Sequence, residues 1–168
     1  MTEVLNINDG VLVLNNKKMT PTEAIDKLEV EIFSKLPLVN CPLSHKFTKG
    51  LYSRTIFMPK GSLITSEIHL THHQYIVSGG VVSVWSDNFG EEVIESPYLG
   101  ETTPNTRRVL YVHEDCTWTT FHPTDLTSVE EIEDTILDKR RNPLLVKMFE
   151  ELVPYVEKLL AYNKNKKQ

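Results

Sequence analysis

The segment from residue 47 to residue 122 most constrains the fold, because it consists of short runs rich in Val, Ile, Thr, Tyr and Trp. Gly, Pro and Asn interrupt these runs at intervals of roughly ten residues, which is the spacing of strands in sandwiches and barrels. The predicted strands are 51–58, 63–70, 74–77, 81–86, 92–95, 107–113 and 117–121. The sequence therefore predicts a mainly β domain.

Helical patterns flank this segment on both sides. Thr20, Pro21 and Glu23 form a helix start with a capping box, which predicts a helix over 20–36. After the β segment, Ser128 with Glu131 and then the pair 142–143 open two more helices, which predicts a helical extension over 128–163. The last helix has a continuous apolar stripe, so it packs either against its own barrel or in a subunit interface.

Length and charge exclude several classes of protein. A chain of 168 residues is the size of one domain, so we expect a single domain over 1–168. The net charge of −5 argues against duplex nucleic acid as a partner. We expect a cytoplasmic protein with no membrane association, because the chain has neither a secretion signal nor a long apolar run. Cys41 and Cys116 are predicted to be reduced thiols.

The segment 61–80 carries the residues that are the strongest candidates for metal binding or catalysis. Glu67 and His69 lie two apart on a predicted strand, so they point to the same face about 7 Å apart. A straight strand would place His73 about 13 Å beyond His69, too far to share one metal ion. We therefore predict a corner at Thr71 and His72, with His72 exposed, that folds His73 back toward Glu67 and His69.

These residues resemble the first motif of the cupin superfamily. That motif is a Gly, five residues, His-x-His, three or four residues, a Glu, six residues and a Gly, and Gly61, Glu67, His69, His73 and Gly80 stand at those places. Glu replaces the first His and His replaces the Glu, but all three can bind a divalent ion. The resemblance implies a cupin-type double-stranded β-helix, or jelly-roll barrel, over 47–124, with one N-terminal and two C-terminal helices.

The second cupin motif is usually a Pro-Gly turn followed by a histidine ligand. In this chain Asn105 stands at the glycine place and Arg108 at the histidine place. Arginine stays protonated and does not bind metals, so a substitute ligand is needed. His122 is the candidate, since Trp118 and Thr120 share its strand face, although the sequence leaves open which face points inward. His113 is a weaker candidate, because it precedes a predicted turn.

Three residues are candidates for contacting a bound molecule: Arg108, Tyr111 and Trp118. Arg108 could pair with Glu67, bind the carboxylate or phosphate of a ligand, or be exposed. Tyr111 and Trp118 could instead be core aromatics, like Trp85. No catalytic residue can be named, because the sequence contains no recognisable phosphate loop, nucleophile elbow or catalytic triad.

The run 68–78 and the segment 108–122 look most like small uncharacterised cupin proteins of tailed bacteriophages and some bacteria, which for a phage protein places it in the host cytoplasm. Three hypotheses follow. The first is a protein that binds a small polar or anionic ligand, together with one divalent ion (Fe, Mn, Ni or Zn) at His69, His73, His122 and Glu67. The second is a metal-dependent enzyme, isomerase or dioxygenase-like, acting on a sugar-like or carboxylate substrate. The third is a structural protein of phage assembly or the virion. A homodimer or higher homo-oligomer is expected in each case.

Overall fold

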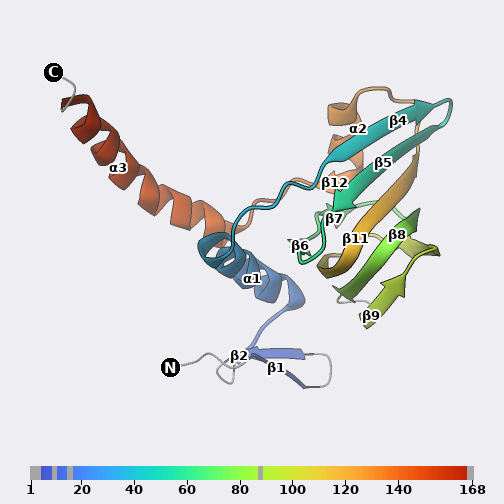
Figure 1. The fold of residues 1–168 in the computed structure, drawn as a ribbon, viewed down its shortest axis with the longest axis horizontal. Helices are drawn as coiled ribbons and strands as arrows, with labels where there is room; N and C mark the ends of the chain where they lie inside the picture. The colour runs from blue at the N-terminus through green and yellow to red at the C-terminus, as the bar shows by residue number, and fades with distance from the viewer. Residues whose placement is uncertain (1–4, 9–10, 15–16, 87–88, 166–168) are drawn as a thin grey trace.

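The computed structural model describes residues 5–8, 11–14, 17–86 and 89–165. The helices are α1 (Pro21–Lys35), α2 (Val129–Ile136) and α3 (Pro143–Asn165). The strands are β1 (Leu5–Asn8), β2 (Val11–Leu14), β3 (Lys17–Lys18), β4 (Leu43–Thr48), β5 (Leu51–Met58), β6 (Leu63–Thr65), β7 (Ile68–His69), β8 (His73–Ser86), β9 (Gly90–Glu95), β10 (Tyr98–Thr102), β11 (Arg108–Pro123) and β12 (Leu137–Asp138). Figure 1 shows the strand body on one side and α1 and α3 on the other.

Two long antiparallel strands, β8 and β11, organise the strand body, because each changes neighbours halfway along. In β8, residues 73–77 pair with β10 and residues 81–86 pair with β9. In β11, residues 116–123 pair with β5 and residues 109–111 pair with β6. The result is a five-stranded layer (β10-β8-β11-β5-β4) and a four-stranded layer (β9-β8-β11-β6) that share the two long strands.

The two layers fold over each other where β8 and β11 bend. Gly80 has a φ of +90°, and an added Cβ there would lie 2.3 Å from the carbonyl oxygen of Asp115. Opposite it, the register of β11 shifts between Val112 and Thr117, and such irregularities bend a strand. The main core lies between the layers and consists of Met58, Tyr75, Val77, Val82, Val84, Ile94, Leu110, Val112, Cys116 and Trp118.

The predicted fold class is confirmed: the chain forms a jelly-roll barrel with one N-terminal and two C-terminal helices. Predicted strands 74–77 and 81–86 are the two halves of β8, and 107–113 and 117–121 fall within β11 apart from residue 107. The single strand predicted over 63–70 is wrong, because the chain forms β6 and β7 with residues 66–67 outside both. β4 and β10 were not predicted, and their exposed residues explain why their pattern is weak.

The helix starts follow the predicted capping chemistry. Thr20 caps α1, with the capping box to Glu23 present, and the side chain of Ser128 caps α2. Helix α2 packs Ile132 and Ile136 against Tyr52, which is fully buried on the inner side of β5. This second core closes one end of the barrel. None of the described helices is both long and apolar enough to cross a bilayer.

Helix α3 contacts α1, and Phe33 and Phe149 meet edge to face with ring centroids 5.0 Å apart. Figure 1 shows its C-terminal end pointing away from the strand body. Phe149, Leu152 and Val153 are 44%, 43% and 53% exposed. Packing of this helix on α1 rather than across a sheet leaves part of its apolar stripe open, and the predicted subunit interface there remains a prediction.

A buried charge cluster fastens the two helices to the start of β11. Asp26 is 4% exposed, and its carboxylate accepts a 2.8 Å hydrogen bond from Arg107 and another from Arg140. Glu29 accepts from Arg107, and Asn142 donates to both the carbonyl oxygen of Asp26 and the carboxylate of Glu29. Because each buried charge has an opposite partner, the desolvation cost of the cluster is compensated.

Candidate functional site

His69 is held by backbone contacts from two other parts of the chain. It lies on the short strand β7, where it pairs with Leu137 of β12. Its carbonyl oxygen accepts a 2.7 Å hydrogen bond from the backbone N–H of Asn105, which has a positive φ of 64°. Asn tolerates this conformation better than most residues, which fits its place in the turn where the second motif usually has glycine. The extension after the barrel therefore helps to position His69.

The predicted corner between the two histidines is present. The chain bends at Thr71, His72 is exposed as expected, and His73 begins β8. The rings of His69 and His73 lie with their centroids 4.4 Å apart. The two residues are buried, with 9% and 5% of their surface exposed. The two imidazoles thus converge inside the barrel.

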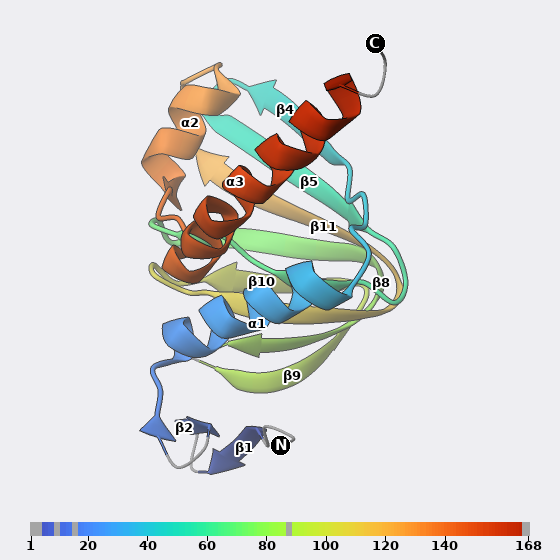
Figure 2. The same cartoon turned by 90° about the vertical axis from the view of Figure 1, so that its left-hand side faces the viewer.

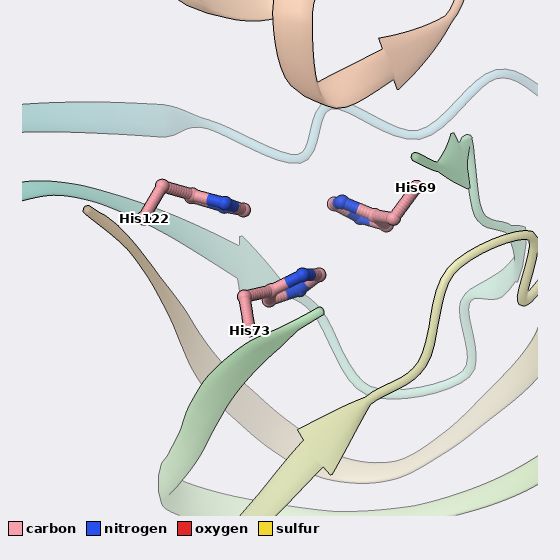
Figure 3. Close-up of side chains that lie close together, drawn as sticks. All are labelled: His69, His73 and His122. Atoms are coloured by element: carbon pink, nitrogen blue, oxygen red, sulfur yellow. The ribbon is translucent and has the colours of Figure 1, made fainter. Parts of the chain in front are cut away.

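His122 joins them from the end of β11. Trp118 and His122 are buried and Thr120 is half-buried, so the face that these three residues share points inward. The His122 ring centroid lies 4.4 Å from that of His73 and 5.9 Å from that of His69. One nitrogen of each ring can be chosen so that all three lie within 4.8 Å of one another. Figure 3 shows the three rings pointing into a common space.

Hydrogen bonds define which nitrogen carries the proton in two of the rings. Nδ1 of His73 donates to the carbonyl oxygen of Thr71 at 3.0 Å, so Nε2 holds the lone pair. The hydroxyl of Thr120 donates to the carbonyl oxygen of Arg54, so it accepts from Nε2 of His122, and Nδ1 of His122 holds the lone pair. These two nitrogens, together with Nδ1 of His69, are buried without a hydrogen-bond partner.

The environment keeps the three rings neutral. Burial and the neighbouring histidines and arginines lower the pKa of His69 from 6.5 to about 3. Burial, with His73 and Arg54, lowers the pKa of His122 to about 4, and burial also lowers the pKa of His73. A metal ion binds the deprotonated imidazole nitrogen, so these rings are in the state that metal binding requires.

The donor set fits a divalent transition metal. Imidazole nitrogens suit Zn, Ni and Fe, and bonds of about 2.1 Å from a central ion require the nitrogens to lie a few ångströms apart. Three buried nitrogens without partners are otherwise costly, since each loses its hydrogen bond to water. His69, His73 and His122 would hold the ion, with further coordination positions open to water or a ligand.

A cavity of about 250 Å³ lies beside two of the three rings and is lined by Leu43, Arg54, Ile56, Met58, Ile64, Thr65, Ser66, Glu67, His69, His73, Thr102, Arg108, Leu110, Trp118 and Thr120. The volume is below the range of drug-sized pockets, so it suits a molecule of few heavy atoms. One part of the wall is aliphatic and aromatic, and the other part carries the histidines and two arginines. A compact molecule with one charged end matches this lining.

Arg108 lies in this cavity and is 6% exposed, so the exposed alternative for this residue is wrong. Its guanidinium carbon is 5.5 Å from the ring centroid of Tyr75 and 6.0 Å from that of Trp118. Those two rings stack on each other with centroids 4.2 Å apart. The aromatic pair fixes the guanidinium near the histidines, where its charge lowers the pKa of His69 and of His73.

Arg54 is a second cation of the cavity that the sequence analysis missed. Its Nε is buried without a hydrogen-bond partner, and its Nη2 lies 3.8 Å from a carboxylate oxygen of Glu133. The sequence pattern could have identified it, because Arg54 alternates with Tyr52 and Ile56 on an inward strand face that is otherwise largely apolar. A cation on such a face indicates a polar cavity.

The aromatic candidates separate clearly. Trp118 is 6% exposed and contributes both to the core and to the cavity wall. Tyr111 is 45% exposed on the outer side of β11, where its ring meets that of His113, so the structure does not bring it into the cavity or the core. Trp85 is half-buried.

Glu67 does not join the histidine group, because the chain leaves the strand conformation at residues 66–67 and turns this side chain outward. It is exposed at the rim of the cavity. His113 is exposed and hydrogen-bonded to Ser83 at 2.7 Å, outside the group of three buried histidines. Cys41 and Cys116 are free thiols, and burial raises the pKa of Cys116 to about 11, which makes it a poor nucleophile.

Comparisons with known proteins give structural likeness only. No family model matches the chain, and no curated protein matches it. Among solved structures, an RmlC-like cupin family protein with a double-stranded β-helix fold from Methanocaldococcus jannaschii matches with 8% identity over 54% of this chain and 86% of that chain, at a TM-score of 0.43. A cupin-2 domain containing protein from Shewanella frigidimarina matches with 8% identity over 58% and 92%, at 0.40. A DMSP lyase from Ruegeria pomeroyi matches with 9% identity over 53% and 49%, at 0.45.

Proposed function

We propose that the barrel binds one divalent metal ion through His69, His73 and His122, and on that ion a small anionic molecule. The observation that carries the proposal is the set of three buried, neutral imidazoles, each with a buried nitrogen that lacks a hydrogen-bond partner. Three such buried nitrogens cost free energy unless a ligand satisfies them. A divalent ion satisfies all three at once.

The charge of the cavity supports an anionic ligand. The guanidinium groups of Arg54 and Arg108 line the cavity beside the histidines, and the ion adds two further positive charges. A carboxylate or phosphate group can bridge the ion and a guanidinium through charge-assisted hydrogen bonds. The aliphatic wall formed by residues such as Ile56 and Leu110 suits the apolar remainder of a small molecule.

A metal-dependent enzyme is the second candidate, and the number of protein ligands favours it. Structural zinc sites usually close the coordination shell with four protein ligands, whereas three leave a position open for water or substrate. When bound, a divalent ion supplies Lewis-acid chemistry to an oxygen of the ligand. Arg108, fixed by its aromatic neighbours, would orient the anionic end of such a substrate, and the buried surroundings would exclude bulk water.

Metal binding can be measured on chelator-treated protein by titration calorimetry and elemental analysis with Zn, Ni, Mn and Fe(II). We expect one ion per chain. Substitution of His69, His73 or His122 by Ala should each weaken binding by more than the roughly 10–100-fold that loss of an outer-shell partner causes. His113→Ala is the matched control, because it removes an exposed histidine outside the cluster.

Three results are informative. Stoichiometric binding that depends on the three buried histidines, and not on His113, supports the proposal. A protein that binds none of the four ions, or binds them equally well in the three variants, contradicts it and favours the structural phage role expected as the third hypothesis. Turnover of small carboxylates or sugars by the loaded protein then distinguishes the enzyme from the binding protein.

A further inference from the structure

The outward face of the five-stranded layer carries almost no charge. Residues that face outward alternate with those that line the barrel, and they are Leu99, Glu101, Gln74, Ile76, Thr117, Thr119, Phe121, Pro123, Leu51, Ser53, Thr55, Phe57, Ser44, Lys46 and Thr48. Only Glu101 and Lys46 among them are charged, although charged residues make up 24% of the chain. The surface therefore carries few charges, and its apolar side chains lie between uncharged hydroxyl and amide groups.

The centre of this outward face hides its own polar groups. The hydroxyls of Thr55 and Thr119 hydrogen-bond to each other at 2.8 Å across β5 and β11. One hydroxyl donates and the other accepts, so the two groups bond to each other within the face. Leu99 is 66% exposed and Phe57 is 39% exposed on the same face.

The described helices do not cover this face. Helix α2 packs on Tyr52, whose side chain points to the inner side of β5, opposite to that of Ser53 and Thr55. Figure 2 shows all three helices in front of the strands, on one side of the strand body.

The two charges occupy the ends of one cross-strand row. The register pairs Glu101 with Gln74, Gln74 with Phe121, Phe121 with Ser53 and Ser53 with Lys46. The row therefore runs from a carboxylate on the edge strand β10 to an ammonium on the edge strand β4, with Phe121 at its middle. Glu101 is 65% exposed at its side chain, where it also pairs with His72, and Lys46 is exposed.

We propose that this outward face binds a second copy of the chain around a twofold axis parallel to β11. Rotation about that axis places β4 of one copy over β10 of the other. Each cross-strand row then faces the same row of the other copy, with its ends reversed. Lys46 then meets the partner's Glu101, and Glu101 meets the partner's Lys46. An axis across the strands would instead stack Lys46 on its own copy, so the charge pattern selects the first arrangement.

The size of the face sets the strength of this dimer. Five strands about 4.8 Å apart and about 20–25 Å of strand length give a footprint of roughly 500 Å² per copy, before the relief of the side chains is counted. Stable interfaces bury roughly 800 Å² per partner, so this face lies at the low end. The dimer is therefore reversible and its population depends on concentration.

Sedimentation equilibrium of the full chain over a range of concentrations tests the proposal. The wild-type protein should approach twice the 19.3 kDa mass of the chain as concentration rises. Thr119→Arg brings two cations together at the axis and should abolish the dimer, whereas Thr119→Val keeps this position uncharged and should preserve the dimer. Thermal unfolding of both variants verifies that each is folded.

Charge reversal tests the predicted register. Lys46→Glu or Glu101→Lys alone places like charges together twice in the dimer and should raise its Kd about tenfold or more, while Lys60→Glu, at an exposed lysine outside the face, should leave it unchanged. The double variant Lys46→Glu with Glu101→Lys should restore the wild-type Kd. A chain that stays monomeric at every concentration, or a dimer that survives Thr119→Arg, overturns the proposal. Failure of the double variant to recover refutes the twofold register.

Discussion

Acidification of the metal-free protein should cost a predictable amount of stability. His69 and His122 have pKa values of about 3 and 4 in the folded chain, far below the value of 6.5 for an unfolded histidine. Between these values the unfolded chain takes up protons that the folded chain does not. The free energy of unfolding is therefore fully retained above pH 6.5 and falls as the pH decreases toward 4.

The size of the loss follows from the unfolded chain. Lowering the pH from 7.5 to 5.0 protonates an unfolded histidine almost completely, which is worth about 2 kcal/mol at 1.36 kcal/mol per pKa unit. His69 and His122 together should therefore lower the free energy of unfolding by about 4 kcal/mol, and the lowered pKa of His73 acts in the same direction. The total free energy of unfolding of a typical domain is only about 5–15 kcal/mol.

Urea unfolding at pH 7.5 and at pH 5.0, both with chelator, measures this loss. The comparison is a variant with His69→Gln and His122→Gln, whose amide side chains do not titrate. Its loss between the two pH values should be smaller than that of the wild-type protein by about 4 kcal/mol. Equal losses in the two proteins would refute the claim that these rings are buried in neutral form.

Three further substitutions have expected effects that the structure defines. Arg108→Gln should weaken the binding of a small dicarboxylate such as oxalate to the metal-loaded protein about tenfold or more without changing the metal stoichiometry, measured by calorimetry; an unchanged affinity would remove this residue from the ligand site. Asp26→Asn breaks a buried ion cluster and should lower the free energy of unfolding, measured in urea, by about 3 kcal/mol. A decrease of less than about 1 kcal/mol would contradict this. Gly80→Ala should destabilise the fold far more than Gly61→Ala, because both glycines have a positive φ but only Gly80 meets backbone atoms at 2.3 Å, and equal melting temperatures would contradict this.

The sequence predicted the barrel and much of the histidine group for identifiable reasons. Alternation and turn spacing are local properties, so β5 was predicted with its observed ends, and the capping residues of α1 and α2 marked their starts. The convergence of His69 and His73 followed from a distance argument, since two ligands on a straight strand lie too far apart. His122 required the inward face of β11, and neighbouring strands rather than local sequence decide that face.

The errors have equally physical causes. Glu67 was placed beside His69 because the segment reads as one strand, but pairing with β11 ends at Thr65 and pairing with β12 begins only at Ile68. β12 lies after α2, far from β7 in the sequence, so no local pattern predicts that the two strands pair. The charge cluster around Asp26 joins residues more than 100 positions apart, and sequence periodicity carries no information on such contacts.

X-ray absorption spectroscopy of the zinc-loaded protein tests the central claim most directly, because it counts the imidazole ligands of the ion. The predicted result is three imidazole nitrogens at about 2.0–2.1 Å, with water or another oxygen ligand filling the remaining shell. A spectrum with one imidazole or none, or with a sulfur ligand at about 2.3 Å, would contradict the proposed metal centre.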